Sequence, residues 1–412
     1  MKGTSLLLLS ALLASALAGW WTKPTVVVRS LLPMLFQAQV TDPYQNQTHF
    51  LYSYQDGIIR QQLYFQSVID DKVGSAIPIM KGYYHAGPSD IQLFEGKLYL
   101  ALNVLRDESA LEYRDVYFME SADKGKTWSA AVAVPREDMK DAFHRYSPMV
   151  VPNEANDRVC LVYFKAAKGQ AEGDVCWACR APGSKVFGNE VAIVKGVPVI
   201  SRVRMAASVH NLRVTLHLLY VAKNENANAL FYHKSTDNGL TWTRQKLSDY
   251  GTLEAYQEPA LITGPSDYKG GRLVVGYSYR GNGDAAMYTS YDNGEKWSSS
   301  MLSGSSKYAI TSLALCNIRM GLWTVFLGRS TDLSPQRVDN DGRHNYWVVD
   351  TSSTRELDNP FTTDNPLLTV YRPQFGCSYF PTTGSFVTAS AIAYFKDSTY
   401  VLLYNRAKAN PT

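Results

Sequence analysis

Short runs of alternating apolar and polar residues follow one another along this chain from Lys23 onward. The runs are rich in Val, Tyr, Leu and Phe, and Gly, Asn, Asp and Pro interrupt them, whereas the 3.6-residue period of an amphipathic helix is nearly absent. This pattern is typical of many short strands joined by tight turns. We therefore predict an all-β protein.

One eight-residue pattern, Ser-x-Asp-x-Gly-x-x-Trp, occurs three times, at residues 121–128, 235–242 and 290–297. We expect a hairpin turn in each copy. The Asp side chain should accept hydrogen bonds from turn amides, the Gly should take a positive φ, and the Trp should pack under the turn. We call these segments the box turns.

The spacing of the box turns indicates a repeat. Their first serines are 114 and 55 residues apart, so the first interval holds two repeats of about 55 residues, with a degenerate copy between them. Further degenerate copies are expected near Ser67 and Asp350. A period of this length, with several short strands in each repeat, predicts a β-propeller.

The expected blades can be located by their first strands. Seven candidates begin near Met34, Pro88, Tyr146, Arg204, Glu258, Ala309 and Thr388. We prefer seven blades, with the N-terminal run 25–29 completing the last blade and closing the ring. Six blades is the alternative, in which residues 35–70 join the last blade instead.

The N-terminus has the features of a secretory signal peptide. Lys2 precedes an apolar run over residues 6–17, and Ala16 and Ala18 form a small-x-small cleavage site. We expect cleavage after Ala18, which leaves residues 19–412 as a single secreted, extracellular, monomeric propeller without a membrane span. The sequon at Asn46 predicts a glycoprotein if the host is eukaryotic.

Cysteine spacing and net charge narrow the kinds of site and partner that we expect for this chain. There are five cysteines, and we expect Cys160 to form a disulfide with Cys176 or Cys179 on an adjacent strand. The CxxC segment has no second pair and no nearby His pair, so no metal site and no cofactor are predicted. The net charge of +4 is scattered, which does not favour nucleic acid as a partner.

In a propeller the ligand site lies around the central axis, at the ends of the inner strands. The candidates there are His85, Arg106, Asp107, Arg145, Tyr146, His210, Tyr256, Glu258, Arg280 and Arg343. Several arginines in one pocket suit an anionic ligand, because a guanidinium group binds a carboxylate through two parallel hydrogen bonds. The predicted partner is therefore an acidic carbohydrate.

Glu258-Pro259, followed by Arg280 and then a box turn, resembles the corresponding blade of the sialidases and trans-sialidases. The resemblance implies that Glu258 polarises a tyrosine nucleophile, and that Arg280 and Arg343 bind the carboxylate of sialic acid. It also implies an acid/base carboxyl group at Asp107, with Asp115 and Glu112 as rivals. A tyrosine nucleophile is chemically reasonable, since the carboxylate of the substrate would repel Asp or Glu.

The chain departs from this family pattern at two positions. No arginine precedes Pro88, where the segment reads Tyr84-His85-Ala86-Gly87, and the register of the nucleophile falls on Ala389. Tyr371, our candidate nucleophile, and Tyr379 lie upstream of that position. Fungal exo-arabinanases share this propeller ancestry and use two glutamates, but no second Glu-Pro begins another predicted blade.

Three functions follow from these features. The first is a glycoside hydrolase-like propeller that acts on an acidic or sialylated glycan. The second is a non-catalytic, lectin-like or adhesin-like propeller that has lost its tyrosine nucleophile. The third is a polysaccharide lyase resembling ulvan lyases, in which His85, Tyr146 or His210 takes the C5 proton of a uronate and Arg145 or Lys165 neutralises its carboxylate.

Overall fold

The computed structural model of the chain contains thirty β-strands and no helix among the residues that it describes. Those residues are 25–32, 34–42, 45–56, 60–83, 85, 89–105, 114–135, 142–153, 158–181, 183–199, 202–210, 213–224, 227–250, 259–263, 273–278, 285–302, 309–319, 322–330, 346–350, 353–358, 368–369, 376–379, 387–395 and 400–406. The all-β prediction is confirmed. No described segment forms a helix of the length and apolar character needed to cross a membrane.

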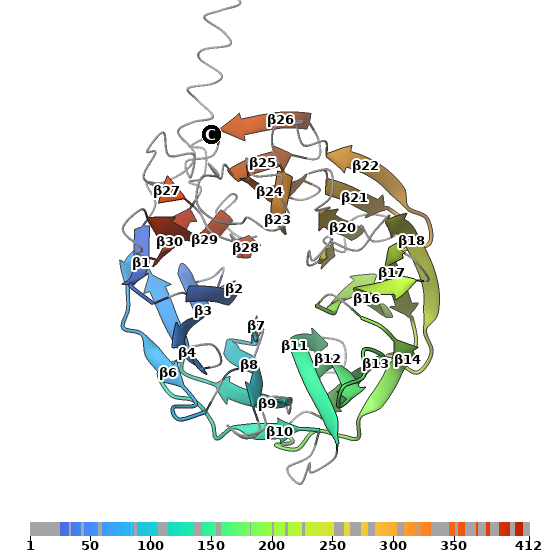
Figure 1. Cartoon of the computed structure of the whole chain (residues 1–412), viewed down its shortest axis with the longest axis horizontal. Helices are drawn as coiled ribbons and strands as arrows, with labels where there is room; N and C mark the ends of the chain where they lie inside the picture. The colour runs from blue at the N-terminus through green and yellow to red at the C-terminus, as the bar shows by residue number, and fades with distance from the viewer. Residues whose placement is uncertain are drawn as a thin grey trace, which may run out of the picture.

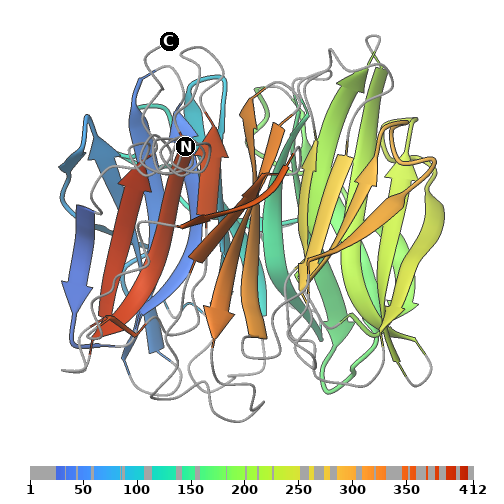
Figure 2. The ribbon, with the colours of Figure 1, turned by 90° about the horizontal axis from the view of Figure 1, so that it is seen from above.

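The described strands form seven antiparallel sheets, which are arranged around a central axis (Figure 1). Seen at right angles to that view, the strands run roughly along the axis (Figure 2). This arrangement is a β-propeller. In sheets 2 to 6 the chain enters at the inner strand and proceeds outward through three further strands.

The first four sheets come from residues 34–250. Sheet 1 contains β2 (Met34–Asp42), β3 (Gln47–Asp56), β4 (Arg60–Ile69), β5 (Lys72–Val73) and β6 (Ile77–Ile79). Sheet 2 contains β7 (Asp90–Phe94), β8 (Lys97–Leu105), β9 (Arg114–Ser121) and β10 (Val132–Val134). Sheet 3 contains β11 (Phe143–Asn153), β12 (Arg158–Ala167), β13 (Gly173–Arg180) and β14 (Val191–Val197). Sheet 4 contains β15 (Arg204–His210), β16 (Arg213–Asn224), β17 (Ala227–Ser235) and β18 (Thr243–Tyr250).

The remaining three sheets complete the ring. Sheet 5 contains β19 (Ala260–Thr263), β20 (Leu273–Ser278), β21 (Ala285–Ser290) and β22 (Ser298–Leu302). Sheet 6 contains β23 (Ala309–Arg319), β24 (Leu322–Ser330), β25 (Tyr346–Asp350) and β26 (Ser353–Asp358). Sheet 7 contains β27 (Leu368–Thr369), β28 (Gly376–Tyr379), β29 (Val387–Phe395), β30 (Tyr400–Arg406) and the N-terminal strand β1 (Thr25–Ser30).

Sheet 7 joins the two ends of the chain. β1 pairs antiparallel with β30, with Thr25 opposite Tyr404 and Ser30 opposite Tyr400. Strands β2 to β6 form a sheet of their own, whereas the six-bladed alternative required residues 35–70 to join the last sheet. Sheet 7 does not begin at Thr388 as predicted, because β28 pairs with β29 on its inner side and makes Thr388 part of the second strand.

The apolar core is divided among the contacts between consecutive sheets. Strand β8 shows the reason, since eight of its nine residues, 98–105, are buried and the strand is covered on both faces. Side chains on one face of β8 belong to a cluster shared with sheet 1, and side chains on the other face belong to a cluster shared with sheet 3. Further clusters join sheets 3 and 4, 4 and 5, and 7 and 1. Each of sheets 1 to 4 is therefore stabilised by both of its neighbours.

The three box turns have the predicted geometry. In the first, Ser121 Oγ donates to Asp123 Oδ1 (2.8 Å) and accepts from Gly125 N (2.7 Å), and Thr127 N donates to Asp123 Oδ1 (2.8 Å). The other two turns repeat these bonds at 2.8 to 2.9 Å. The three glycines have φ of 84°, 85° and 84°.

Each box turn packs on an aromatic ring in the third strand of the preceding sheet. The ring pairs are Trp128 with Phe65, Trp242 with Trp177, and Trp297 with Tyr232, with centroids 5.1, 6.1 and 4.9 Å apart. A Cβ atom added to the box glycine would lie 2.0 to 2.2 Å from the nearest atom of the same aromatic side chain. The glycine is therefore required both by its positive φ and by this close approach.

The degenerate copy expected in the first interval lies at residues 180–187. Gly188 N donates to Cys179 O in sheet 3, as Ser129 N donates to Glu120 O after the first box turn. Phe187 occupies the place of the Trp and packs on Phe118 of sheet 2, with ring centroids 5.0 Å apart. The contact between turn and preceding sheet thus persists where the Asp and Trp are lost.

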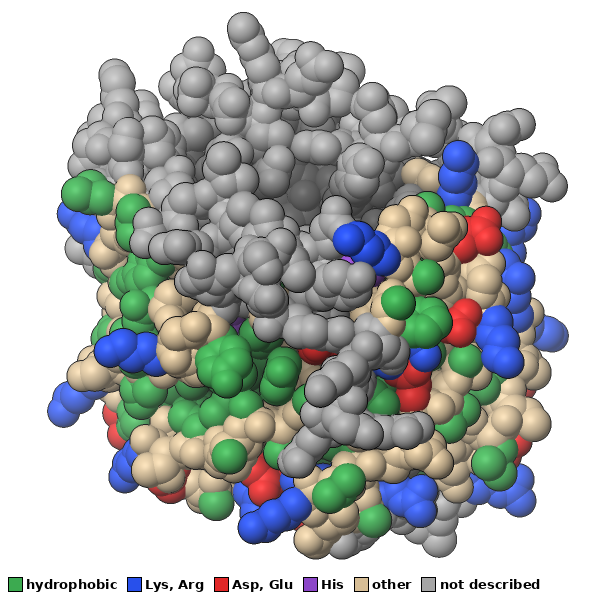
Figure 3. Space-filling view, turned by 60° about the horizontal axis from the view of Figure 1, so that its bottom comes forward, with side chains coloured by type: hydrophobic (Ala, Val, Ile, Leu, Met, Phe, Trp, Pro, Cys, Tyr) green, Lys and Arg blue, Asp and Glu red, His purple; other side chains and the backbone are tan. Residues whose placement is uncertain are grey.

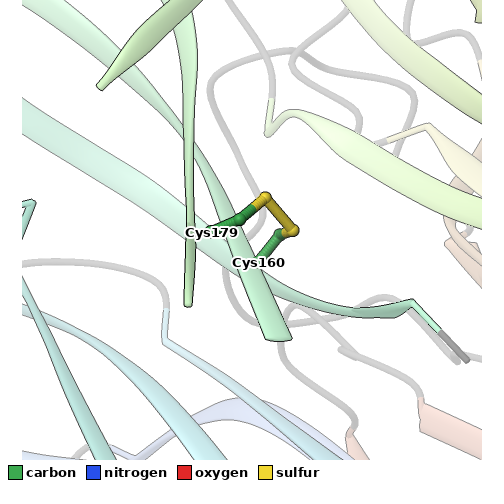
Figure 4. The surroundings of a disulfide bond; sticks show 2 residues. All are labelled: Cys160 and Cys179. Atoms are coloured by element: carbon green, nitrogen blue, oxygen red, sulfur yellow. A yellow bond between two sulfur atoms is a disulfide. The ribbon is translucent and has the colours of Figure 1, made fainter. Parts of the chain in front are cut away.

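Cys160 and Cys179 form a disulfide between β12 and β13, where they lie directly opposite each other (Figure 4). This confirms the expected pairing of Cys160 with one member of the CxxC segment. The other member, Cys176, is a buried free thiol on the opposite face of β13, and burial raises its pKa to about 12. It is therefore protonated at neutral pH and unreactive in the folded protein.

Candidate functional site

The inner strands are exposed to the axis along one edge, so their polar groups and first residues decide what the centre of the ring can bind (Figure 1). Seven of the predicted site residues lie outside the described residues: Arg106, Asp107, Tyr256, Glu258, Arg280, Arg343 and Tyr371. His85, Arg145, Tyr146 and His210 belong to the part of the chain that the structure describes.

His85 is buried inside sheet 2. Its backbone forms an isolated bridge with Val104, and its Nε2 atom lies 3.3 Å from the carbonyl oxygen of Ile79. Burial lowers its pKa to about 4, against the opposing effect of the Ile79 hydrogen bond. The imidazole is therefore neutral at pH 7. With only 1% of the residue exposed, it does not face a ligand pocket.

Arg145 is buried in an ionic cluster within sheet 3. Its Nε donates to Glu190 Oε2 (2.9 Å), while Lys165 Nζ donates to Glu190 Oε1 (2.5 Å) and Tyr163 OH to Glu190 Oε2 (2.8 Å). These three donors lower the pKa of Glu190 although burial raises it. Two cations thus share one carboxylate. Arg145, with 3% of its side chain exposed, is paired with Glu190 and not presented to the axis.

Tyr146 follows Arg145 at an irregularity in the pairing of β11 with β12. Its ring packs edge-on against Phe164, with centroids 4.9 Å apart. Ser147, the next residue, has a φ of 55°, which fits a strand that bends at this point. Tyr146 is half-buried. Its side chain therefore keeps some exposure beside the head of the inner strand β11.

His210 differs from its prediction. It is the last residue of β15 and lies opposite Arg213 in the turn to β16, whereas the strand begins at Arg204. The two ends of this strand are six residue steps apart along the extended chain, on the order of 20 Å. The strand begins at Arg204, where we predicted the blade to begin, so His210 lies at the far end of the strand and not at its head.

A polar cluster that we did not predict lies among the inner strands. We call Gln37, Asp90, Arg202 and Arg204 the axial cluster. Arg202 Nη1 donates to the carbonyl oxygen of Gln37 in sheet 1 (3.4 Å), and Arg204 Nε donates to the carbonyl oxygen of Pro259 beside sheet 5 (3.1 Å). These two arginines of sheet 4 thus reach two other parts of the ring.

Asp90 is the carboxylate of the axial cluster. Its Oδ2 accepts hydrogen bonds from Val150 N in sheet 3 (2.9 Å) and from Gln92 Nε2 (3.3 Å). Burial raises its pKa, while the Val150 amide and the charges of Arg204 and Arg202 lower it. A buried carboxyl group with two neighbouring guanidinium groups at the centre of a ring is a functional-site candidate. In the sequence, the two arginines of this cluster stand out as Arg202-Val203-Arg204 at the start of a predicted strand.

Hydrogen bonds extend from the axial cluster through the first three sheets. Gln37 Nε2 donates to Ser53 Oγ (3.1 Å), and Gln37 Oε1 accepts from Ser89 N (3.2 Å). Asn103 N donates to Ser89 Oγ (3.4 Å), and Asn103 Nδ2 donates to the carbonyl oxygen of Arg145 (2.9 Å). The centre of this half of the ring is therefore a connected polar network, in which the donors and acceptors fix one another.

The described residues contain no group of three or more His, Cys, Asp or Glu that could hold a metal ion. On the face shown in Figure 3, Lys and Arg side chains are scattered around the rim, with Asp and Glu among them. The described part of that face has no single basic patch.

Comparison with solved structures shows where this fold occurs. An α-L-arabinanase of Penicillium chrysogenum, complexed with arabinobiose, is 13% identical and has a TM-score of 0.53, covering 81% of this chain and 99% of its own. A GH93 α-L-arabinofuranosidase of Fusarium graminearum is 13% identical with a TM-score of 0.49, covering 74% and 93%. A Hadza microbial sialidase is 12% identical with a TM-score of 0.48, covering 86% and 76%.

Of these three superpositions, that of the arabinanase exceeds a TM-score of 0.5, and at 13% identity it shows the fold alone. No protein-family model matches the chain. No curated protein matches it either. The comparison therefore confirms the predicted β-propeller fold, which this chain shares with the arabinanase.

Proposed function

We propose that this protein is a secreted glycoside hydrolase that binds an acidic glycan at the centre of the ring. The observation that carries the proposal is the charge of the inner strands. In the axial cluster two guanidinium groups, those of Arg202 and Arg204, lie near the one carboxyl group of Asp90. This excess of cations favours a ligand that carries a carboxylate.

The chemistry would follow the residues that the sialidase resemblance assigns. Asp107 would donate a proton to the leaving oxygen, and Glu258 would polarise the hydroxyl group of Tyr371 for attack on the anomeric carbon. Arg106, Arg280 and Arg343 would bind the carboxylate of the sugar. Arg204 supports this arrangement, because it bonds the carbonyl oxygen of Pro259, the residue next to Glu258.

Secretion is supported by the disulfide between Cys160 and Cys179, since such bonds persist in oxidising compartments. Expression of the full chain in a eukaryotic host tests this part of the proposal. Recovery from the medium of a protein that begins at residue 19 is the expected result. Retention of residues 1–18 in the cell fraction would contradict it.

Turnover tests the reaction. Residues 19–412 would be incubated with a fluorogenic sialoside, with an arabino-oligosaccharide, since the Penicillium enzyme was complexed with arabinobiose, and with an acidic polysaccharide. We expect the protein to release a product from a glycoside substrate, and we expect the rate of release to be at least about 100-fold lower in Glu258→Gln. The control is Glu120→Gln, a partly exposed carboxylate that pairs with Arg180 between the sheets. Equal rates for the two variants would contradict the assignment of Glu258.

The second candidate is a glycan-binding propeller without catalysis. It is favoured by Ala389, which replaces the expected tyrosine and lies in β29 opposite Cys377. Glycan binding that requires Arg280 and Arg343, without turnover of any substrate, would establish it. The lyase is disfavoured, because His85 is buried against Ile79 and Arg145 and Lys165 are both paired with Glu190.

A further inference from the structure

The inner strands of sheets 2 to 5 are tied to one another by bonds that no sheet pairing provides. Val150 N of β11 donates to Asp90 of β7, and Met205 N of β15 donates to the sulfur of Met149 in β11 (3.3 Å). Arg204 Nε then donates to the carbonyl oxygen of Pro259, just before β19. Inner strands have one unpaired edge, so these bonds satisfy polar groups that would otherwise face the axis.

The hydrogen bond from Arg204 to the carbonyl oxygen of Pro259 restrains the backbone at a proline. Proline has no N–H group and a fixed φ, so its carbonyl oxygen is the backbone group through which Pro259 can be held. The residue before a proline is restricted to extended backbone conformations. We therefore expect an anchor on Pro259 to restrict the residue before it, Glu258, which lies outside the described residues.

Asp90 sets the charge environment of the anchor. It is 8% exposed and keeps its own hydrogen bonds to Val150 and Gln92. Burial raises the pKa of Asp90 and the charge of Arg204 lowers it, so the two groups lie within electrostatic reach of each other. Sheets 2, 3, 4 and 5 thus contribute to the position of one carbonyl oxygen.

We propose that Arg204, supported by Asp90, is a positioning residue that fixes the head of β19 and thereby the carboxylate of Glu258. This inference rests on the proposed function, because it assigns the catalytic role to Glu258. It adds Asp90 and Arg204 to the residues that the sequence assigns to the site.

The test compares Arg204→Met with Arg180→Met, in wild-type and Glu258→Gln backgrounds. Arg180 is a matched control, since its Nη2 bonds Glu120 Oε2 (2.6 Å) and so links sheet 3 to sheet 2 away from the axis. In the wild-type background we expect Arg204→Met to lower kcat about 10- to 100-fold with KM within about twofold, as a misplacement of about 1 Å costs 100-fold. In Glu258→Gln it should cause less than a twofold further loss.

A purely structural role would give a different pattern. The loss caused by Arg204→Met would then be equal in both backgrounds, and Arg180→Met would reproduce it. Either result overturns the proposal. Asp90→Asn, which keeps the acceptor for Val150 N and removes the charge, should show a smaller kcat loss of the same kind.

Hydrogen exchange at the amides of residues 260–263 separates this proposal from the proposed function. If the wild type turns over no glycan, the hydrolase proposal fails. The exchange experiment then tests by itself whether Arg204 anchors the head of β19. Exchange at least tenfold faster in Arg204→Met, but unchanged in Arg180→Met, supports the anchor. Unchanged exchange in Arg204→Met overturns it, whatever the enzyme activity.

Discussion

Acidification should destabilise this protein through His217, which is fully buried in β16. Its Nε2 lies 2.7 Å from Ser208 Oγ, its Nδ1 lies 2.7 Å from Tyr232 OH, and its ring stacks on Tyr232. Burial, together with the charge of Lys234, lowers its pKa to about 3. The folded protein therefore holds this imidazole neutral over the whole range in which an unfolded histidine becomes charged.

The sign and size of the effect follow from linkage. An unfolded histidine titrates near pH 6.5, so below that pH the unfolded state binds a proton that the folded state does not. The contribution of His217 is full above about pH 6.5 and is lost progressively as the pH falls toward 3. Two pH units below 6.5, at pH 4.5, the loss is about 3 kcal/mol.

Urea unfolding of wild type and His217→Gln at pH 7.5, 6.5, 5.5 and 4.5, followed by tryptophan fluorescence, measures this loss. The variant should be less stable at pH 7.5, but its free energy of unfolding should fall by about 3 kcal/mol less between pH 7.5 and 4.5. His144→Gln, a partly exposed histidine of β11, controls for the removal of a histidine as such. Parallel curves for wild type and His217→Gln would refute the reasoning.

Three further predictions concern stability and reactivity. Glu190→Gln leaves the buried Arg145 and the partly exposed Lys165 without their carboxylate and should cost about 3–5 kcal/mol in urea unfolding, whereas Glu120→Gln should cost at most about 1 kcal/mol; equal costs would show that the Glu190 cluster is not desolvated. Gly239→Ala combines a φ of 85° with a Cβ 2.1 Å from an indole ring, so it should lower the melting temperature well beyond Gly96→Ala, which has a φ of 74° and open space; similar shifts would mean that the ring gives way freely. Cys176 should resist alkylation at pH 8 in the folded protein and react after denaturation, as read by peptide mass spectrometry, and labelling of the native protein would contradict its burial.

The sequence determined those parts of the structure that depend on residues close together in the chain. A box turn is built by Ser, Asp and Gly within five positions, so its spacing alone predicts its hydrogen bonds. Three such turns at a common period predict the repeat, and the repeat predicts the ring. The turn at residues 180–187 shows the limit, since its closing hydrogen bond and its aromatic contact persist without the Asp and Trp that would identify it.

The centre of the ring was decided by the tertiary structure. Arg202 and Gln37 are 165 residues apart, and Asp90 and Val150 are 60 apart, so their contacts exist only because the sheets close around one axis. Likewise, Arg145 fits the pattern of a ligand-binding arginine until Glu190, 45 residues away, pairs with it. Closing the ring determines which charges meet at the axis, because the period of the repeat places every inner strand beside the axis but does not specify which side chains meet there.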